Sequence, residues 1–162
     1  MGLLFRLLQM TTPVKQAFQI LAVDDESTVL RGIKMLLEHD GHKVHAVDSG
    51  EAAMVLFEQR RFDLVITDFS MPGMKGDQLA ARIKAIRPDQ PIIMATAFAD
   101  EFKTFGRPSG GVDFLLFKPF SIADLREAID QVLPGRNPDR DSGMNLDFSQ
   151  PSAPKPGPSP KP

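Results

Sequence analysis

The sequence predicts an α/β domain built on a doubly wound parallel sheet. Short apolar runs alternate with segments of helical apolar spacing, and the central run, Leu64–Asp68, carries no charge before its last residue. Such a run, closed here by Pro72, Gly73 and Gly76, is typical of a strand buried on both faces of a parallel sheet. Asp68 is therefore expected at the carboxyl end of a central strand, where open α/β sheets place their ligand sites. The alternative is that Asp68 caps the next helix.

Five strands are predicted from the apolar runs, at Ile20–Val23, Lys43–Val47, Leu64–Asp68, Pro91–Thr96 and Val112–Phe117. Helices are predicted between and after them, from Ser27 to about Asp40, from the cap Ser49 through Phe57, from about Asp77 to Arg87, and from Ser121 to about Leu133. This alternation predicts right-handed crossovers, helices on both faces and the flavodoxin-like strand order 2-1-3-4-5.

One helix of the pattern is expected to be irregular. The segment Glu101–Gly111, between the last two strands, contains Gly106, Pro108 and Gly110. Proline inside a helix costs about 3 kcal/mol, so the fourth helix is expected to be short, broken or mobile.

The 162 residues are expected to form one domain, at residues 17–134, between two flanking segments. Residues 1–16 are interpreted as a dispensable extension, with translation starting instead at Met10 as one possibility. A short partner- or membrane-touching helix is the alternative, because Leu3, Leu4, Leu7 and Leu8 have helical spacing. Residues 135–162 are rich in proline and are expected to be a disordered tail. After Leu133 no second apolar pattern follows, so an attached output domain is not expected.

The composition restricts partners and compartment. The net charge of −2 at pH 7 does not favour nucleic acid as the main partner. No apolar run approaches the about 20 residues that span a bilayer. Cysteine is absent, which excludes disulfides and thiolate chemistry and fits the reducing cytoplasm, the expected location.

Polar residues stand at four of the predicted strand ends: Asp24 and Asp25, Asp68, Thr96, and Lys118. The carboxyl ends of parallel strands share one edge of the sheet, so these five side chains are expected to converge. Each has a structural alternative, with Asp25 as a helix cap, Thr96 as an ordinary strand residue and Lys118 as a surface lysine. Their joint placement at strand ends favours a functional cluster.

The chemistry of such a cluster points to phosphoryl transfer. Neighbouring carboxylates repel each other unless a cation lies between them, and oxygen ligands in this number suit Mg²⁺. Lys118 adds a positive charge for a transferred phosphoryl group, and the Thr96 hydroxyl can donate to one of its oxygens. Asp68 is then the natural nucleophile, forming an aspartyl phosphate.

Taken together, Asp24-Asp25, Asp68 with Ser70-Met71-Pro72-Gly73 and Gly76, Thr96-Ala97, and Lys118-Pro119-Phe120 resemble the receiver domain of two-component response regulators. The resemblance implies that Asp68 accepts a phosphoryl group from the phosphohistidine of a sensor histidine kinase or phosphotransfer protein. It implies that Asp25, Asp68 and the backbone carbonyl of Ser70 bind Mg²⁺, with Asp24 supporting, and that Thr96 and Lys118 contact the phosphoryl group. It also implies a cis Lys118-Pro119 bond, slow self-dephosphorylation, and a stand-alone protein that signals to a downstream protein by direct contact.

The sequence departs from that family at the position three residues before the lysine. Receiver domains usually carry Tyr or Phe there, and this chain has Leu115. Phe114 and Phe117 are expected to face the other side of the sheet and not to replace the aromatic ring. Together with the Gly/Pro-rich fourth helix, Leu115 favours an alternative function, an interaction module that works without phosphorylation.

Two other interpretations are disfavoured. A phosphatase of the haloacid-dehalogenase type needs a second acid two residues after the nucleophile, where Ser70 stands. A metal site is suggested by His39, His42 and His45, which lie close in sequence. Their expected place is largely opposite the acidic cluster, so solvated side chains are the default interpretation.

Overall fold

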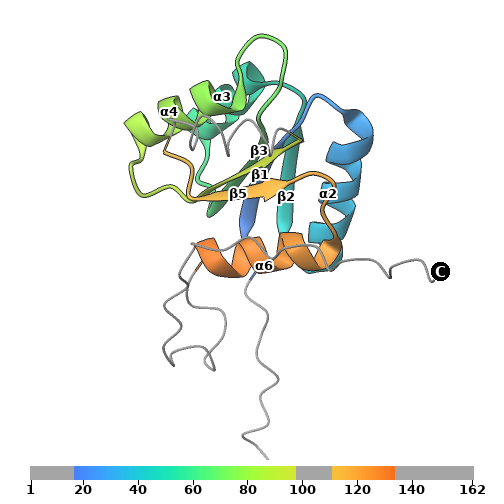
Figure 1. Cartoon of the computed structure of the whole chain (residues 1–162). Helices are drawn as coiled ribbons and strands as arrows, with labels where there is room; N and C mark the ends of the chain where they lie inside the picture. The colour runs from blue at the N-terminus through green and yellow to red at the C-terminus, as the bar shows by residue number, and fades with distance from the viewer. Residues whose placement is uncertain (1–16, 98–110, 134–162) are drawn as a thin grey trace, which may run out of the picture.

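A five-stranded parallel sheet forms the centre of the computed structural model, which describes residues 17–97 and 111–133 (Figure 1). The strand order is β2-β1-β3-β4-β5, and each neighbouring pair is parallel. The strands are β1 (Gln19–Val23), β2 (Lys43–Val47), β3 (Leu64–Asp68), β4 (Ile92–Thr96) and β5 (Phe114–Phe117). The helices are α2 (Ser27–His39), α3 (Gly50–Gln59), α4 (Gly76–Ile86) and α6 (Ile122–Val132). The predicted fold class and strand order are confirmed.

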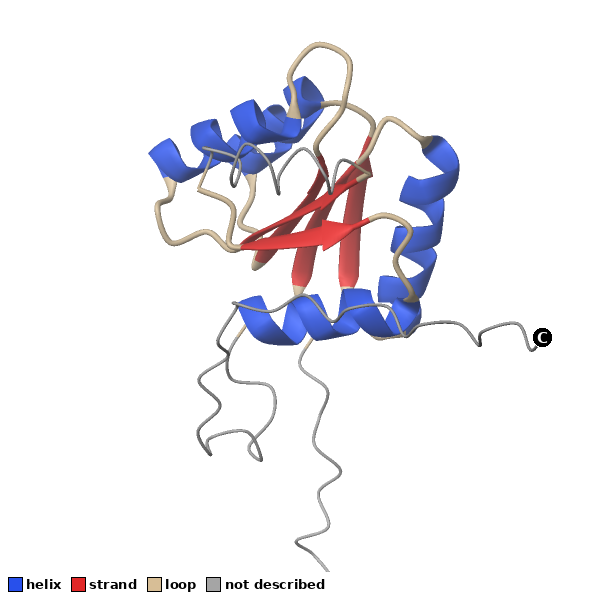
Figure 2. Ribbon diagram, viewed as in Figure 1, coloured by secondary structure: helices blue, strands red, loops and turns tan. Residues whose placement is uncertain are grey.

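Helices cover both faces of the sheet (Figure 2). Strand alternation divides the core, because successive side chains of a strand point to opposite faces. In β1, Ile20 and Ala22 pack with α2 and α6, whereas Leu21 and Val23 pack with α3 and α4. All five residues of β3 are buried, so the central strand is enclosed on both faces as its apolar run predicts.

The predictions for the flanking segments and for the fourth helix stay predictions. Residues 1–16, most of Glu101–Gly111 and residues 135–162 lie outside the described part of the chain. The domain boundaries at residues 17 and 134 therefore stay predictions. Among the described residues, no helix is long and apolar enough to cross a membrane.

Two of the three clustered histidines pack against aromatic rings. His42 is buried, accepts the Phe18 backbone N–H through Nδ1 at 3.3 Å, and stacks on the Phe18 ring with centroids 5.6 Å apart. His45 meets the Phe62 ring edge-on at a centroid distance of 5.5 Å. The expectation of a solvated side chain is wrong for His42, which fastens the start of β1 to the start of β2.

An ion pair joins α6 to the end of α2. Arg126 Nε and Nη2 donate to Asp40 Oδ2 and Oδ1, both at 2.7 Å. Asp40 is the C-terminal cap residue of α2 and is only 8% exposed, whereas nearly half of the Arg126 side chain is exposed. The pair therefore ties the two helices on this face of the sheet together through a buried carboxylate.

Replacing Arg126 by methionine is expected to lower the free energy of unfolding by clearly more than the control variant does, because the buried carboxylate of Asp40 would lose two charge-assisted hydrogen bonds. Urea unfolding measures the change. Lys34→Met is the matched control, since Lys34 pairs with Glu38 at 3.9 Å on the exposed side of α2. Such surface pairs contribute about 0.5 kcal/mol or less. Equal losses in the two variants would contradict the importance of the buried carboxylate.

Candidate functional site

Lys118 binds two buried carboxylates at the carboxyl edge of the sheet. Its Nζ lies 2.8 Å from Asp24 Oδ2 and 2.7 Å from Asp68 Oδ1. Asp24 follows β1, Asp68 ends β3, and Lys118 follows β5, so three strands of the sheet supply the group. The Lys118 side chain is 19% exposed, which rules out the alternative of a surface lysine. The structure thus brings these three predicted residues together, and the Lys118-Pro119 bond is cis as expected.

Asp24 also fixes the turn into α2. Its Oδ1 accepts the Glu26 backbone N–H at 2.8 Å, while its other oxygen faces Lys118. The N-terminal cap of α2 is Glu26, without a side-chain capping bond. Asp25 is exposed between them, and the alternative that it caps the helix is wrong. Asp25 is therefore an accessible carboxylate next to a buried one.

Asp68 organises the loop that follows β3. Its Oδ2 accepts the backbone N–H of Ser70 at 2.7 Å. The next helix, α4, begins only at Gly76 and has Lys75 as its cap, so Asp68 is not a helix cap. Both carboxylate oxygens of Asp68 thus have protein donors, one from a side chain and one from the backbone, which fixes the orientation of the carboxylate.

Two contacts that the sequence did not reveal hold this loop. Glu51, in the first turn of α3, accepts the Met74 backbone N–H through Oε1 at 3.0 Å. Gly76 packs so closely that a Cβ atom built on it would overlap the carbonyl oxygen of Asp68. The spacing of Asp68 and Gly76 had indicated only a turn. A close backbone contact between two segments has no signature in one sequence beyond the glycine itself.

Thr96 and Ser70 complete the predicted set. Thr96 is fully buried at the end of β4, and its carbonyl oxygen accepts the Lys118 backbone N–H at 2.7 Å. Ser70 is exposed and follows the acceptor strand by two residues. All the predicted site residues therefore lie at the carboxyl ends of β1, β3, β4 and β5, on one edge of the sheet.

The donor set fits a hydrated magnesium ion. In the described part of the chain, no three His, Cys, Asp or Glu residues form a group that could enclose a metal. Mg²⁺ usually keeps several waters and takes one or two carboxylates from the protein, so it needs no such enclosure. The predicted ligands Asp25, Asp68 and the Ser70 carbonyl would offer two carboxylates and one carbonyl from the ends of the neighbouring strands β1 and β3, which are the donor types that Mg²⁺ prefers.

Burial and charge act in opposite directions in the cluster. Burial raises the pKa of the Asp68 carboxyl above its ordinary value, and the hydrogen bond and positive charge of Lys118 oppose this increase only in part. Burial acts to lower the pKa of Lys118, but the hydrogen bonds to Asp24 and Asp68 outweigh it and raise that pKa. Lys118 therefore stays charged, and the Asp68 carboxylate is more basic than an exposed aspartate.

The aromatic residues of β5 differ from the sequence prediction. Leu116 is buried among α2 and α6, and Phe114 packs against the same cluster. Leu115 and Phe117 are two residues apart and so share the opposite face of the strand. The expectation that Phe117 faces away from Leu115 is wrong, because only odd steps change the face. Phe117 is 40% exposed, so this face presents an aliphatic side chain and an aromatic one together.

Comparison with known proteins gives concordant matches. The protein-family model described as "Response regulator receiver domain" matches residues 20–130 of this chain. Chemotaxis protein CheY-3 of Vibrio cholerae is 37% identical over 120 residues, which cover 70% of this chain and 90% of that protein. Virulence sensor protein BvgS of Bordetella pertussis is 35% identical over 131 residues, which cover 75% of this chain but 11% of BvgS. The chain thus spans about a tenth of the length of that relative.

Solved structures match over the same region. The response regulator protein TrrA from Thermotoga maritima, solved in complex with Mg²⁺ and BeF, is 31% identical with a TM-score of 0.65, covering 71% of this chain and 98% of that one. A response regulator receiver domain protein from Clostridium thermocellum is 35% identical with a TM-score of 0.65, covering 72% of this chain and 94% of that one. The similarity extends over almost the whole of each solved chain.

Proposed function

This chain belongs to the response regulator receiver domain family, and on that premise we propose that Asp68 accepts a phosphoryl group from a phosphohistidine. The donor is a sensor histidine kinase or a phosphotransfer protein. The observation that carries the proposal is the buried contact of Lys118 with Asp68 and Asp24, at 2.7 and 2.8 Å. It supplies an oriented nucleophile and a fixed positive charge at the same point.

In the proposed step, an Asp68 carboxylate oxygen attacks the phosphorus atom of the donor. A P–O bond forms, the P–N bond to the donor histidine breaks, and the histidine nitrogen takes a proton from water. Lys118 neutralises charge on the phosphoryl oxygens, and the Thr96 hydroxyl donates to one of them. Fixed positions and charge neutralisation supply most of what phosphoryl transfer needs.

Magnesium is the proposed cofactor, held by Asp25, Asp68 and the Ser70 carbonyl with Asp24 supporting. When bound, it would neutralise charge that develops on the transferred group. Asp25 is the accessible carboxylate of the set, and Ser70 is held in place through its backbone N–H bond to Asp68. TrrA, a relative solved with Mg²⁺ and BeF, supports the same cofactor for this chain.

We further propose that the aspartyl phosphate hydrolyses slowly, through attack of water on phosphorus and release of inorganic phosphate. Ala97 supports access for that water, because it is small and exposed next to Thr96. The phosphorylated protein passes its signal to a downstream protein by direct contact.

Phosphorylation should depend on magnesium and on Asp25. With acetyl phosphate and Mg²⁺, the intact mass should increase by one phosphoryl group, and EDTA should prevent the increase. Asp25→Asn should need at least about tenfold more Mg²⁺ for the half-maximal rate, a loss of about 1.4 kcal/mol in metal binding. Asp48→Asn is the control, because Asp48 is an exposed acid at the carboxyl end of β2.

This experiment tests the proposed function and the proposed cofactor separately. Labelling that persists in EDTA would overturn the magnesium assignment but not the acceptor. A folded wild-type protein that gains no mass from acetyl phosphate or from a histidine kinase would overturn the proposed function.

A further inference from the structure

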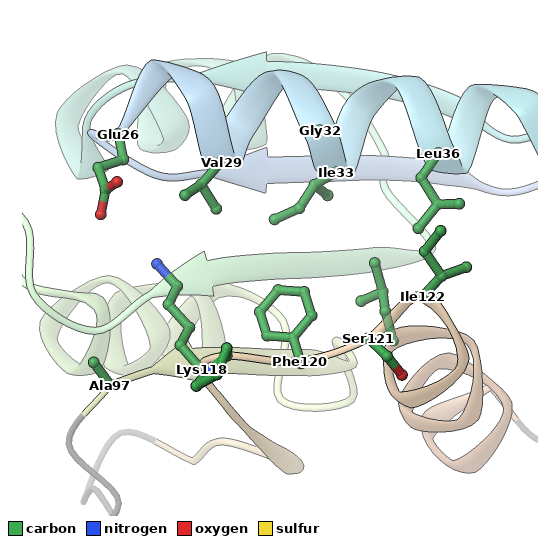
Figure 3. A pocket seen from close by; sticks show the side chains of 12 residues that line it. Glu26, Val29, Gly32, Ile33, Leu36, Ala97, Lys118, Phe120, Ser121 and Ile122 are labelled. Atoms are coloured by element: carbon green, nitrogen blue, oxygen red, sulfur yellow. The ribbon is translucent and has the colours of Figure 1, made fainter.

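The loop that follows β3 packs on the face of the sheet that α3 and α4 cover. On the other face, Lys118 and Ala97 lie at the end of an apolar groove between α2 and the segment that leads into α6 (Figure 3). The loop side chains Met71 and Met74 are instead buried in the core beside α3 and α4. The position of residues 70–74, which include the Ser70 carbonyl, therefore depends on contacts with the α3 side of the fold.

One hydrogen bond joins this loop to α3. Glu51 Oε1 accepts the Met74 backbone N–H at 3.0 Å, although the two residues are 23 positions apart. Among the described residues, it is the only hydrogen bond between residues 70–74 and a helix. The Ser70 N–H bonds to the Asp68 carboxylate. The segment is thus held at both ends, by β3 at its start and by α3 at its end.

Two glycines allow the loop and α3 to come this close. Gly73 has a φ of +74°, which side chains rarely adopt, and a Cβ atom built on it would lie 2.9 Å from Glu51 Oε1. On α3, a Cβ atom built on Gly50 would lie 2.8 Å from the Cβ atom of Met74. Both glycines border the same contact, one from the loop and one from the helix, so the contact is a close-packed part of the fold.

The start of α3 is a rigid support for Glu51. Ser49 caps the helix, and its hydroxyl oxygen accepts the Ala52 backbone N–H at 3.3 Å. Ala53 and Phe57 are fully buried and anchor the helix in the core. A carboxylate in the first turn of a helix is also favoured by the helix dipole. Glu51 therefore presents its oxygen to the loop from a fixed element.

We propose that Glu51 is a positioning residue for the magnesium site, because its bond to Met74 fixes the backbone that presents the Ser70 carbonyl. This role rests on the proposed function, in which that carbonyl is a Mg²⁺ ligand. Without the bond, rotation about Gly73, which has no Cβ, would let the loop shift. Octahedral coordination of Mg²⁺ tolerates little displacement of a ligand. Residues that hold a metal ligand in place typically contribute about ten- to a hundredfold to metal affinity.

Two variants separate geometry from charge. Glu51→Ala removes both the acceptor oxygen and the negative charge, whereas Glu51→Gln removes the charge and keeps an oxygen that can accept the Met74 N–H. Glu58→Ala is the matched control, since Glu58 is an exposed acid on the same helix. Mg²⁺ binding to each full-length protein is measured by isothermal titration calorimetry. We expect Glu51→Ala to bind Mg²⁺ about tenfold more weakly than the wild type, and the other two variants to bind within about twofold of it.

Phosphorylation and hydrogen exchange supply two further readouts. With acetyl phosphate, Glu51→Ala should need about tenfold more Mg²⁺ for the half-maximal rate and reach the wild-type rate at saturation, because the acceptor Asp68 is unchanged. In EDTA, the amides of residues 69–75 should exchange faster in Glu51→Ala than in the wild type, and at the wild-type rate in Glu51→Gln. Circular dichroism and urea unfolding in EDTA check that each variant keeps the fold.

The outcomes distinguish this role from the proposed function. Wild-type Mg²⁺ affinity in Glu51→Ala would overturn the role of Glu51, and so would an equal loss in Glu51→Gln, which would assign the effect to charge. A wild type that binds Mg²⁺ but gains no phosphoryl group would contradict the proposed function, while weaker binding by Glu51→Ala would still support the role of Glu51. A wild type that binds no Mg²⁺ would overturn the magnesium site and the role of Glu51 together.

Discussion

Replacing Asp68 by asparagine should leave the protein folded and unable to take up a phosphoryl group. The amide of asparagine is a poor nucleophile. It keeps the shape of the carboxylate, but its single oxygen can accept only one of the two bonds that Ser70 and Lys118 donate to Asp68. With acetyl phosphate and Mg²⁺, we expect the mass gain of the wild type to disappear completely. The wild type and the variant are compared side by side by intact mass spectrometry.

The same substitution should not destabilise the protein. Burial raises the pKa of Asp68 in the folded state above its value in the unfolded chain. The folded state therefore favours the protonated form, and the stability of the wild type falls as the pH rises through these two pKa values. Asparagine is uncharged at every pH and avoids this loss. In EDTA at pH 7, the free energy of unfolding of Asp68→Asn should equal or exceed that of the wild type.

Asp48→Asn is the control for both measurements, since it removes a carboxylate from the same edge of the sheet outside the Lys118 cluster. It should be phosphorylated like the wild type. A mass gain retained in Asp68→Asn would show that another residue is the acceptor, and marked destabilisation would show that the Lys118 contact outweighs the cost of burying the carboxylate.

Gly76→Val should cause the largest loss of stability, because its Cβ would overlap the carbonyl oxygen of Asp68 and two more methyl groups would have to fit beside it. Neither the last residue of β3 nor the first turn of α4 can move without breaking buried contacts. We expect a loss of about 3 kcal/mol or more in urea unfolding.

Gly32→Ala is a control variant that should raise the free energy of unfolding instead of lowering it. Both glycines are helical, but a Cβ on Gly32 meets nothing within 4 Å. The alanine variant should gain up to about 1 kcal/mol from helix propensity. Similar effects at the two positions would mean that the close contact of Gly76 does not constrain the fold.

Prediction from the sequence succeeded where a local pattern of residues determines the structure. Apolar runs without charge located the buried strands, and the polar residues after them located one edge of the sheet. It failed where two distant segments meet. The Arg126 contact with Asp40 joins residues 86 positions apart, and nothing in either neighbourhood predicts the pairing. Likewise, no local pattern indicates that Glu51 holds the backbone of Met74.

The error over Phe117 has a different origin. Strand periodicity alone places Phe117 on the same face as Leu115, because the two residues are two positions apart. The helix cap assigned to Asp25 as an alternative illustrates a further limit, since Asp24 and Asp25 are chemically identical. Only the three-dimensional arrangement separates the buried residue, which contacts Lys118 and Glu26, from the exposed one.

The contact of Lys118 with two carboxylates also determines which ions can balance this edge of the sheet. Asp24, Asp25 and Asp68 carry three formal negative charges and Lys118 carries one positive charge, so the group is doubly negative. A divalent cation brings it to electroneutrality, whereas sodium or potassium leaves one charge uncompensated. At the proposed Mg²⁺ site, monovalent salt should therefore compete weakly, and the ionic composition of the surroundings would act on the protein separately from the proposed phosphoryl donor.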